Sequence, residues 1–264
     1  MSAGSDIGFA LAKSWTDQGA KTTGTFRRPE DKHALESIGV LPIHCELTSR
    51  WSVTRAARRL GKVASKEAVS TLVFAAGIMD PIGKFGSVPY ETWAQSFGIN
   101  FLSQAKILHH IIGKLEDGCR VLFFAGGGTN NAPTDYSAYI LSKIALTKFC
   151  ELLSKEYPAY AFVSAGPGWV NTKIHQQTID AGTAAGENLN RTLSKLKAKD
   201  TLPMETVIER VNQLLSLDKG IVTGRNFSLA NDPITKDELL ASLSENEDMY
   251  KLRRMGNELF HFPT

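Results

Sequence analysis

The segment AGGGTNNAPTDYSAYILSK, residues 125–143, ends in two side chains that together could move a proton. Tyr139 and Lys143 are four residues apart in a stretch that predicts a helix, so both should lie on one helix face. A free phenol has a pKa of about 10, and a nearby ammonium favours phenolate. We therefore expect Lys143 to lower the pKa of Tyr139 towards the range of a general acid or base. The alternative for this pair alone is an ordinary amphipathic helix whose apolar residues face the core.

The rest of the chain, on both sides of Tyr139 and Lys143, alternates regularly between two sequence patterns. Short β-like runs alternate with amphipathic stretches along almost the whole chain, which predicts crossover units around a parallel sheet. Apolar runs such as TLVFAA (71–76) suit strands covered by helices on both faces. We predict an α/β fold with a doubly wound parallel sheet and a single domain over residues 1–264, because no repeat or linker interrupts the chain. The expected strands are 21–26, 40–45, 71–75, 120–125, 161–165 and 221–229, and the expected helices are 9–18, 53–63, 92–115, 139–156 and 207–217.

Two segments break this alternation. Residues 175–200 are polar, contain glycine and become helical, and they follow an expected strand. A long excursion at such a point is either a substrate lid or a surface helix. Residues 234–264 predict a C-terminal helix and an extended tail, which would pack on the body or on a partner subunit.

Composition excludes several classes of function. The net charge is +3, and residues of both signs are mixed along the chain. The sequence has no concentrated basic stripe, so we expect no nucleic-acid partner. No run of 18 apolar residues occurs, so we expect no membrane span. The six histidines show no metal-ligand spacing. The three cysteines, an odd number in apolar contexts, predict reduced core thiols and hence a cytoplasmic protein.

The N-terminal segment, residues 1–28, predicts a turn, a helix, a second turn and a strand that ends in Arg27 and Arg28. A glycine-containing turn that opens a helix is typical of the phosphate-binding end of a nucleotide fold. Such a turn normally follows a buried strand, and Met1 stands where that strand should end. Three explanations are open: a natural start upstream of Met1, another segment in the place of the strand, or weak dinucleotide binding.

In this order and spacing, the motifs of the chain resemble those of the short-chain dehydrogenase/reductase family over nearly the whole sequence, without its first strand. Asp6-Ile7-Gly8 resembles the end of the family's glycine turn, with aspartate in place of its middle glycine. CELT (45–48) resembles the acidic-aliphatic pair beside the adenine, and VFAAG (73–77) resembles the NNAG stretch with alanines in place of the asparagines. Asn100, Tyr139-x3-Lys143, GPGWVNT (166–172) and VTGRNFSLAND (222–232) resemble the later motifs.

The resemblance implies a Rossmann-like sheet and a nicotinamide cofactor. It implies that Tyr139 exchanges a proton with the substrate oxygen, that Lys143 also holds the nicotinamide ribose, and that Asn100 holds a relay water. For Asn100 the alternative is an exposed polar residue. The cofactor-binding residues that the resemblance implies are Ile7, Gly8, Arg27, Leu47, Ala75, Ala76, Gly77, Asn100, Tyr139, Lys143, Pro167, Gly168, Val170 and Thr172.

One catalytic group of the family is missing. The family places a substrate-polarising serine where this chain has Gly126, between Ala125 and Gly127. Loss of one hydrogen-bond donor to a developing oxyanion can cost about 10²–10³ in rate. A backbone N–H of residues 126–128, a water molecule or Thr129 could substitute, or the chain could have lost catalysis.

The end of the expected strand 21–26 predicts the type of cofactor. An NAD-selective site carries an acidic residue at that point for the ribose diol. Here Arg27 and Arg28 stand there instead, and guanidinium groups suit the 2′-phosphate of NADP. We expect NADP rather than NAD, with Arg27 as the contact because it is closer to the strand.

The sequence therefore predicts an NADP-dependent oxidoreductase that interconverts a carbonyl and an alcohol of a small-molecule substrate. The alternative from another class is a degenerate binding or scaffold subunit with little or no turnover, which the missing serine and strand favour. An epimerase-like activity would use the same tyrosine and lysine. The family resemblance implies a homodimer or homotetramer, in which Trp93, Phe97 and Phe101 fit either a subunit interface or a plain core.

Overall fold

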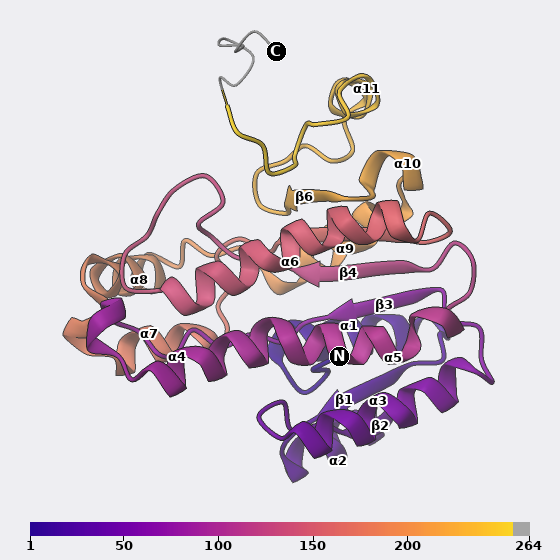
Figure 1. The fold of residues 1–264 in the computed structure, drawn as a ribbon, viewed down its shortest axis with the longest axis horizontal. Helices are drawn as coiled ribbons and strands as arrows, with labels where there is room; N and C mark the ends of the chain where they lie inside the picture. Colours follow the sequence, from indigo (N-terminus) through magenta and orange to yellow (C-terminus); the bar gives the residue numbers. More distant parts are fainter. Residues whose placement is uncertain (256–264) are drawn as a thin grey trace, which may run out of the picture.

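The computed structural model describes residues 1–255 and has helices on both sides of a layer of parallel strands (Figure 1). Two strands, β1 and β2, form one sheet, and the other four form a second sheet in the order β3-β4-β5-β6. All pairings are parallel. The predicted α/β class and parallel sheet are confirmed. The strands are β1 (Thr23–Phe26), β2 (Leu41–His44), β3 (Thr71–Phe74), β4 (Arg120–Phe124), β5 (Ala161–Gly166) and β6 (Arg225–Ser228).

The helices alternate with these strands, as the amphipathic pattern predicts. Polar side chains begin some of them: Ser5 caps α1 by accepting from Gly8 N (3.3 Å), and Ser49 caps α3 by accepting from Ser52 N (3.3 Å). The α-helices are α1 (Asp6–Asp17), α2 (Pro29–Ser37), α3 (Arg50–Ala64), α4 (Tyr90–Phe97), α5 (Ser103–Ile111), α6 (Ser137–Glu156), α7 (Ile174–Asp180), α8 (Glu187–Ala198), α9 (Met204–Ser216), α10 (Lys219–Val222) and α11 (Asp237–Glu245).

Each face of the main sheet has its own hydrophobic core. Successive residues of β4 alternate between the two, because side chains in a strand point to opposite faces. Val121 and Phe123 belong to the core beneath α3, α5 and α6, where Phe123 stacks on Phe74 with ring centroids 4.5 Å apart. Leu122 and Phe124 belong to the opposite core, which α1, α9 and α11 cover. This two-sided burial is what a doubly wound sheet requires.

A third and much smaller core lies at the corner formed by α1, β1 and α2. Its buried members are Ala3, Ala12, Leu35 and Val40. β1 and β3 are not paired with each other, and residues 1–2 lie between them. The Met1 amino group donates to Val73 O, and Met1 O accepts from Ala75 N (3.1 Å). Ser2 N donates to Thr25 Oγ1 (2.7 Å), so the first two residues connect the two sheets.

Most predicted elements are present, with three differences. The last expected strand, 221–229, is shorter, because residues 219–222 form α10 and only Arg225–Ser228 pair with β5. The expected helix 92–115 is interrupted by a π-helical turn at Gly98–Leu102, which separates α4 from α5. The pattern also missed α2, whose polar sequence buries Leu35 alone.

The segment 175–200 contains α7, a short 3-10 turn and α8, and it packs across neighbouring loops. Gln177 Oε1 accepts from Met79 N (2.6 Å), and the Thr178 hydroxyl lies 2.8 Å from the Tyr136 hydroxyl. Asn188 Nδ2 donates to Thr134 O (3.1 Å). These contacts fasten the segment to the loop after β3 and to the loop before α6.

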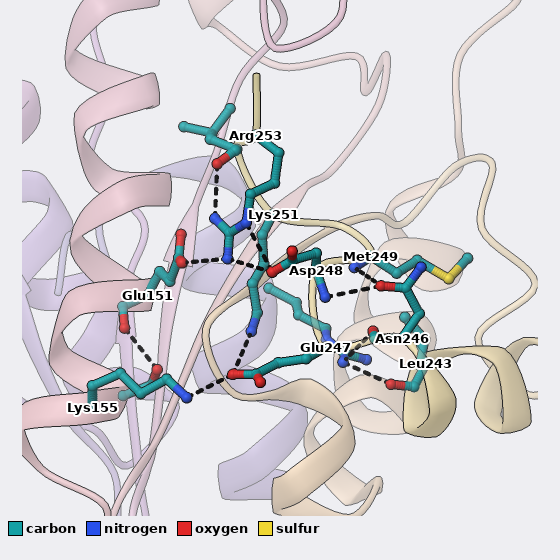
Figure 2. A network of polar contacts seen from close by, with 12 residues as sticks. Glu151, Lys155, Leu243, Asn246, Glu247, Asp248, Met249, Lys251 and Arg253 are labelled. Carbon is teal, nitrogen blue, oxygen red and sulfur yellow. Dashed lines mark hydrogen bonds and ion pairs between the residues drawn. The ribbon is translucent and has the colours of Figure 1, made fainter. Parts of the chain in front are cut away.

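Ion pairs fasten the chain after α11 to α6 (Figure 2). Arg253 lies 2.8 Å from both Glu151 of α6 and Asp248, and Lys155 lies 2.6 Å from Glu247. Asn226 N of β6 donates to Tyr250 O (2.9 Å), so the segment also runs beside the sheet. The predicted C-terminal helix is α11, and the last part of the predicted tail, residues 256–264, lies outside the described residues.

The three cysteines, Cys45, Cys119 and Cys150, are free and buried, as the sequence predicts. Within residues 1–255, no helix has the length and apolar character needed to cross a membrane. The same residues contain no group of three or more potential metal-ligating side chains.

Candidate active site

A cavity of about 880 Å³ lies at the carboxyl ends of the parallel strands. Its walls are the loops that leave β1, β2, β3, β4, β5 and β6, together with the N-terminal end of α1 and parts of α7 and α8. Open parallel sheets bind ligands at this edge because the loops there converge on a crevice. The cavity is therefore the candidate site.

Tyr139 reaches this cavity from the first turn of α6. Its side chain is half-buried, and its hydroxyl makes no hydrogen bond with any part of the chain that the structure describes. By contrast, the nearby Tyr136 hydroxyl is already bonded to Thr178. The Tyr139 hydroxyl is thus available to a ligand in the cavity.

Lys143 lies one helical turn further on and is 4% exposed. Its ammonium donates to Phe124 O (2.8 Å) and Ala76 O (3.2 Å), which are the carbonyls at the end of β4 and just after β3. It lies 5.7 Å from the centre of the Tyr139 ring. An ammonium has three N–H donors, so one remains for a ligand hydroxyl or for the phenol oxygen.

The pKa values correct one expectation from the sequence. Burial raises the pKa of Tyr139 to about 12, whereas we expected Lys143 to lower it. Burial also lowers the pKa of Lys143 to about 8. Desolvation causes both shifts, because burial disfavours the charged form of each group. In this geometry the phenol is therefore a neutral proton donor.

The glycine loop packs closely against Tyr139. A Cβ added at Gly126 would lie 2.6 Å from the Tyr139 hydroxyl oxygen and 2.9 Å from its ring. A Cβ at Gly128, whose φ is +100°, would lie 2.5 Å from Ile140. Nothing lies within 4 Å of a Cβ at Gly127. The loop backbone therefore packs directly against the start of α6, and Tyr139 fills the space that a side chain at position 126 would need.

Asn100 lies in the π-helical turn, is fully buried and does not line the cavity. Its side-chain oxygen accepts from Ile78 N (2.9 Å), and its amide donates to Ile78 O (2.9 Å). Asn100 is thus not the exposed residue of the alternative interpretation. Its side chain clamps the loop after β3, and the water relay implied by the resemblance stays a prediction.

The N-terminal end of α1 forms one end of the cavity. Ile7 lines it and Gly8 does not, and a Cβ at Gly8 would meet Ser2 O at 2.2 Å. Gly4 and Asp6 line the cavity instead. The Asp6 carboxylate accepts from Lys173 N (2.7 Å) in the loop after β5. The sequence shows the aspartate in place of the family's middle glycine, but it gives no indication of the contact with Lys173.

The two arginines after β1 have different surroundings. Arg28 pairs with Asp31 (2.7 Å), and this hydrogen bond holds the pKa of the Asp31 carboxyl below its usual range. Arg27 is exposed, lines the cavity and makes no ion pair within residues 1–255. Leu47, after β2, lies on the same wall.

The remaining predicted residues lie further along the cavity, towards Tyr139. Gly77 packs beside Lys143, whose ammonium would be 3.5 Å from a Cβ at that position. The cavity lining also includes Ala75, Ala76, Pro167, Gly168, Val170 and Thr172.

An aromatic stack that the sequence analysis did not single out forms another wall. Trp169 stacks on His175 with ring centroids 4.6 Å apart, and Arg191 and Lys195 of α8 each lie 5.9 Å from the indole. Burial lowers the pKa of His175, whose Nε2–H donates to Val170 O (2.9 Å). In the sequence, the one feature that could have indicated this stack is the tryptophan inside GPGWVNT.

Comparison with known proteins decides the family. A family profile described as enoyl-(acyl carrier protein) reductase matches residues 2–230. The chain belongs to the short-chain dehydrogenase/reductase family.

Two curated proteins are similar to this chain in sequence. An uncharacterised oxidoreductase of Saccharomyces cerevisiae is 25% identical over 240 residues, which cover 88% of this chain and 91% of that protein. An uncharacterised oxidoreductase of Schizosaccharomyces pombe is 25% identical over 171 residues, 63% of this chain and 66% of that protein. The family and these named relatives support an oxidoreductase.

Solved structures confirm the fold. A short-chain dehydrogenase/reductase of Saccharomyces cerevisiae has a TM-score of 0.77 at 20% identity and covers 91% of this chain and 96% of its own. An actinorhodin polyketide ketoreductase solved with NADPH has a TM-score of 0.73 at 18% identity, with coverage of 88% and 95%. The Rossmann-like sheet predicted from the sequence is thus confirmed.

The contact between Gly126 and Tyr139 yields a prediction about stability. We expect Gly126→Ala to lower the free energy of unfolding by about 1–3 kcal/mol, because the added methyl group overpacks against the phenol. Gly127→Ala is the matched control and should change it by less than about 0.5 kcal/mol, since that position is open. Urea unfolding of the three proteins measures both values. Equal stability of the two variants would contradict this close packing.

Proposed function

We propose that the protein is an NADP-dependent oxidoreductase that interconverts a carbonyl and an alcohol, with Tyr139 as the acid or base. The observation that carries this proposal is the unpartnered Tyr139 hydroxyl, which lines the cavity one helical turn from the buried Lys143 ammonium. The NADPH bound to the polyketide ketoreductase of similar fold agrees with it. The family assignment supports the oxidoreductase class.

Several features of the cavity suit a dinucleotide. The backbone of residues 75–77 lines the wall beside Lys143, and the exposed Arg27 lies after β1 where a 2′-phosphate needs a guanidinium. The third N–H of Lys143 could hold a ribose hydroxyl of the cofactor. When bound, the reduced nicotinamide supplies a hydride for the carbonyl carbon.

The chain's own residues would then handle the proton. Because its pKa is about 12, Tyr139 is a neutral phenol at pH 7 and can donate its proton to the carbonyl oxygen of a substrate during reduction. The Lys143 ammonium stabilises the phenolate that remains. In the absence of a serine hydroxyl, the proposal assigns the second hydrogen bond to the substrate oxygen to a backbone N–H of residues 126–128, to Thr129 or to water.

Removal of the phenol hydroxyl tests this function. We expect Tyr139→Phe to lower the turnover of carbonyl reduction by about 10²–10⁴, the usual contribution of a positioned general acid. Tyr157→Phe, at the far end of α6, is the control and should keep the activity. The assay follows NADPH oxidation with a panel of aldehydes and ketones. Absence of turnover in the unmodified protein across the panel would overturn the proposal.

The pKa of Lys143 predicts a pH dependence. If the ammonium is required, the reduction rate should fall as the pH rises through about 8, because the charged form is lost above its pKa. Tyr139, with a pKa of about 12, stays protonated over this range and contributes no second limb below about pH 10. A profile of kcat/KM from about pH 6 to 10 measures this. A rate that rises continuously across that range would contradict the requirement.

Arg27 should set the choice between the two cofactors. We expect Arg27→Ala to weaken NADPH binding by about 10–100-fold and to leave NADH binding unchanged, because a charge-assisted hydrogen bond to the 2′-phosphate is lost. Arg28→Ala is the control, since Arg28 is already paired with Asp31. Titrations of cofactor fluorescence provide the dissociation constants. An equal loss of NADPH and NADH affinity in Arg27→Ala would argue against the role of Arg27.

A degenerate binding subunit is the second candidate function. The observation that favours it is the Gly126 position, where the phenol itself occupies the space of the hydroxyl-bearing side chain. The Tyr139→Phe assay distinguishes the two candidates, because a binding subunit has no turnover to lose.

A further inference from the structure

Asp6 places a negative charge in an unexpected part of the cavity. It is the first residue of α1, and its Oδ2 accepts from Lys173 N (2.7 Å), while its Oδ1 lies 3.7 Å from Lys173 Nζ. Asp6 and Lys173 both line the cavity. The carboxylate therefore links the start of α1 to the loop after β5.

The surroundings of Asp6 are already occupied by charged groups. Gly4, two residues earlier, approaches the Asp31 carboxyl so closely that an added Cβ would lie 2.9 Å from it. Asp31 is neutralised by Arg28 at 2.7 Å, with Glu30 also 3.3 Å from that guanidinium. Lys173 is the one cation within salt-bridge distance of Asp6 among residues 1–255, at 3.7 Å.

A dinucleotide would need the same place for its diphosphate. The N-terminal end of a helix attracts anions because its first backbone N–H groups are unpaired and the helix dipole is positive there. In α1 a carboxylate already benefits from this field, and it would repel a diphosphate brought to the same helix end.

We propose that Asp6 is an anionic gate at the diphosphate end of the cavity. Its carboxylate holds the loop after β5 against α1 through Lys173, and its charge opposes a diphosphate brought to the same helix end. Asp6 thereby sets a low affinity for diphosphate-containing ligands. This inference rests on the proposed function for the identity of the ligand, and it concerns binding rather than turnover.

The Asp6→Asn variant tests the gate. The amide oxygen can still accept from Lys173 N, so the contact is kept and the charge is removed. Asp17→Asn is the matched control, because Asp17 ends the same helix and is exposed. The probes are inorganic pyrophosphate, NADPH and 2′-AMP, titrated by calorimetry at fixed ionic strength.

We expect Asp6→Asn to bind pyrophosphate and NADPH at least tenfold more tightly than the unmodified protein, and 2′-AMP, which has no diphosphate, equally well. Asp17→Asn should match the unmodified protein with all three probes. Unchanged pyrophosphate and NADPH affinities in Asp6→Asn, or no measurable binding of either probe to it, would overturn the gate.

A second measurement reports the contact without any cofactor. Hydrogen exchange at the Lys173 amide should be slow in the unmodified protein and faster in Asp6→Gly, which lacks the acceptor. Equal exchange would show that Asp6 does not hold this loop. Tighter binding by Asp6→Asn together with no carbonyl reduction would leave the gate standing and overturn the oxidoreductase proposal, so the two can fail separately.

Discussion

A single buried ammonium organises the candidate site. Lys143 is bonded to the carbonyls of Phe124 and Ala76, which belong to neighbouring strand ends, and this fixes α6 against the edge of the sheet where the loops converge. Burying a charge is costly unless it is hydrogen-bonded, and these two carbonyls offset that cost. The position of Tyr139, one turn earlier, follows from the placement of Lys143.

The glycine loop and the tyrosine form one unit. Because Tyr139 packs on the backbone of Gly126, the serine that the family pattern places at this position would require the phenol to shift. The sequence shows which residue stands at position 126, but it does not show that the phenol fills the space above it. A substitution chosen by family resemblance alone, such as serine at 126, would therefore disturb the residue it was meant to assist.

Much of the fold could be predicted because it depends on local patterns. Apolar runs such as 71–75 and 120–125 predicted all six strands, and the helix that carries Tyr139 and Lys143 was found almost to its ends. α2 was missed because it buries Leu35 alone. The π-helical turn at Gly98–Leu102 was missed because apolar residues continue through it and its i→i+5 hydrogen bonds have no distinct residue pattern. The direction of the Tyr139 pKa shift was wrong because desolvation depends on the folded surroundings. The contact between Asp6 and Lys173 joins residues that are 167 apart in sequence, and no local pattern encodes it.

The small core beside β1 has a consequence for how the molecule responds to thermal motion. Four buried residues hold α1, β1 and α2 together, while α1 also places Leu11 in the core of the main sheet, and its Trp15 Nε1 donates to Asn212 Oδ1 of α9 (2.8 Å). Regions with few buried apolar contacts open at lower free energy than the global transition. β1 and α2 should thus open more readily than the strands of the main sheet, whereas α1 stays with the core that it shares with that sheet. Any ligand that contacts both Arg27 and Tyr139 would join the end of β1 to α6 and make this opening rarer.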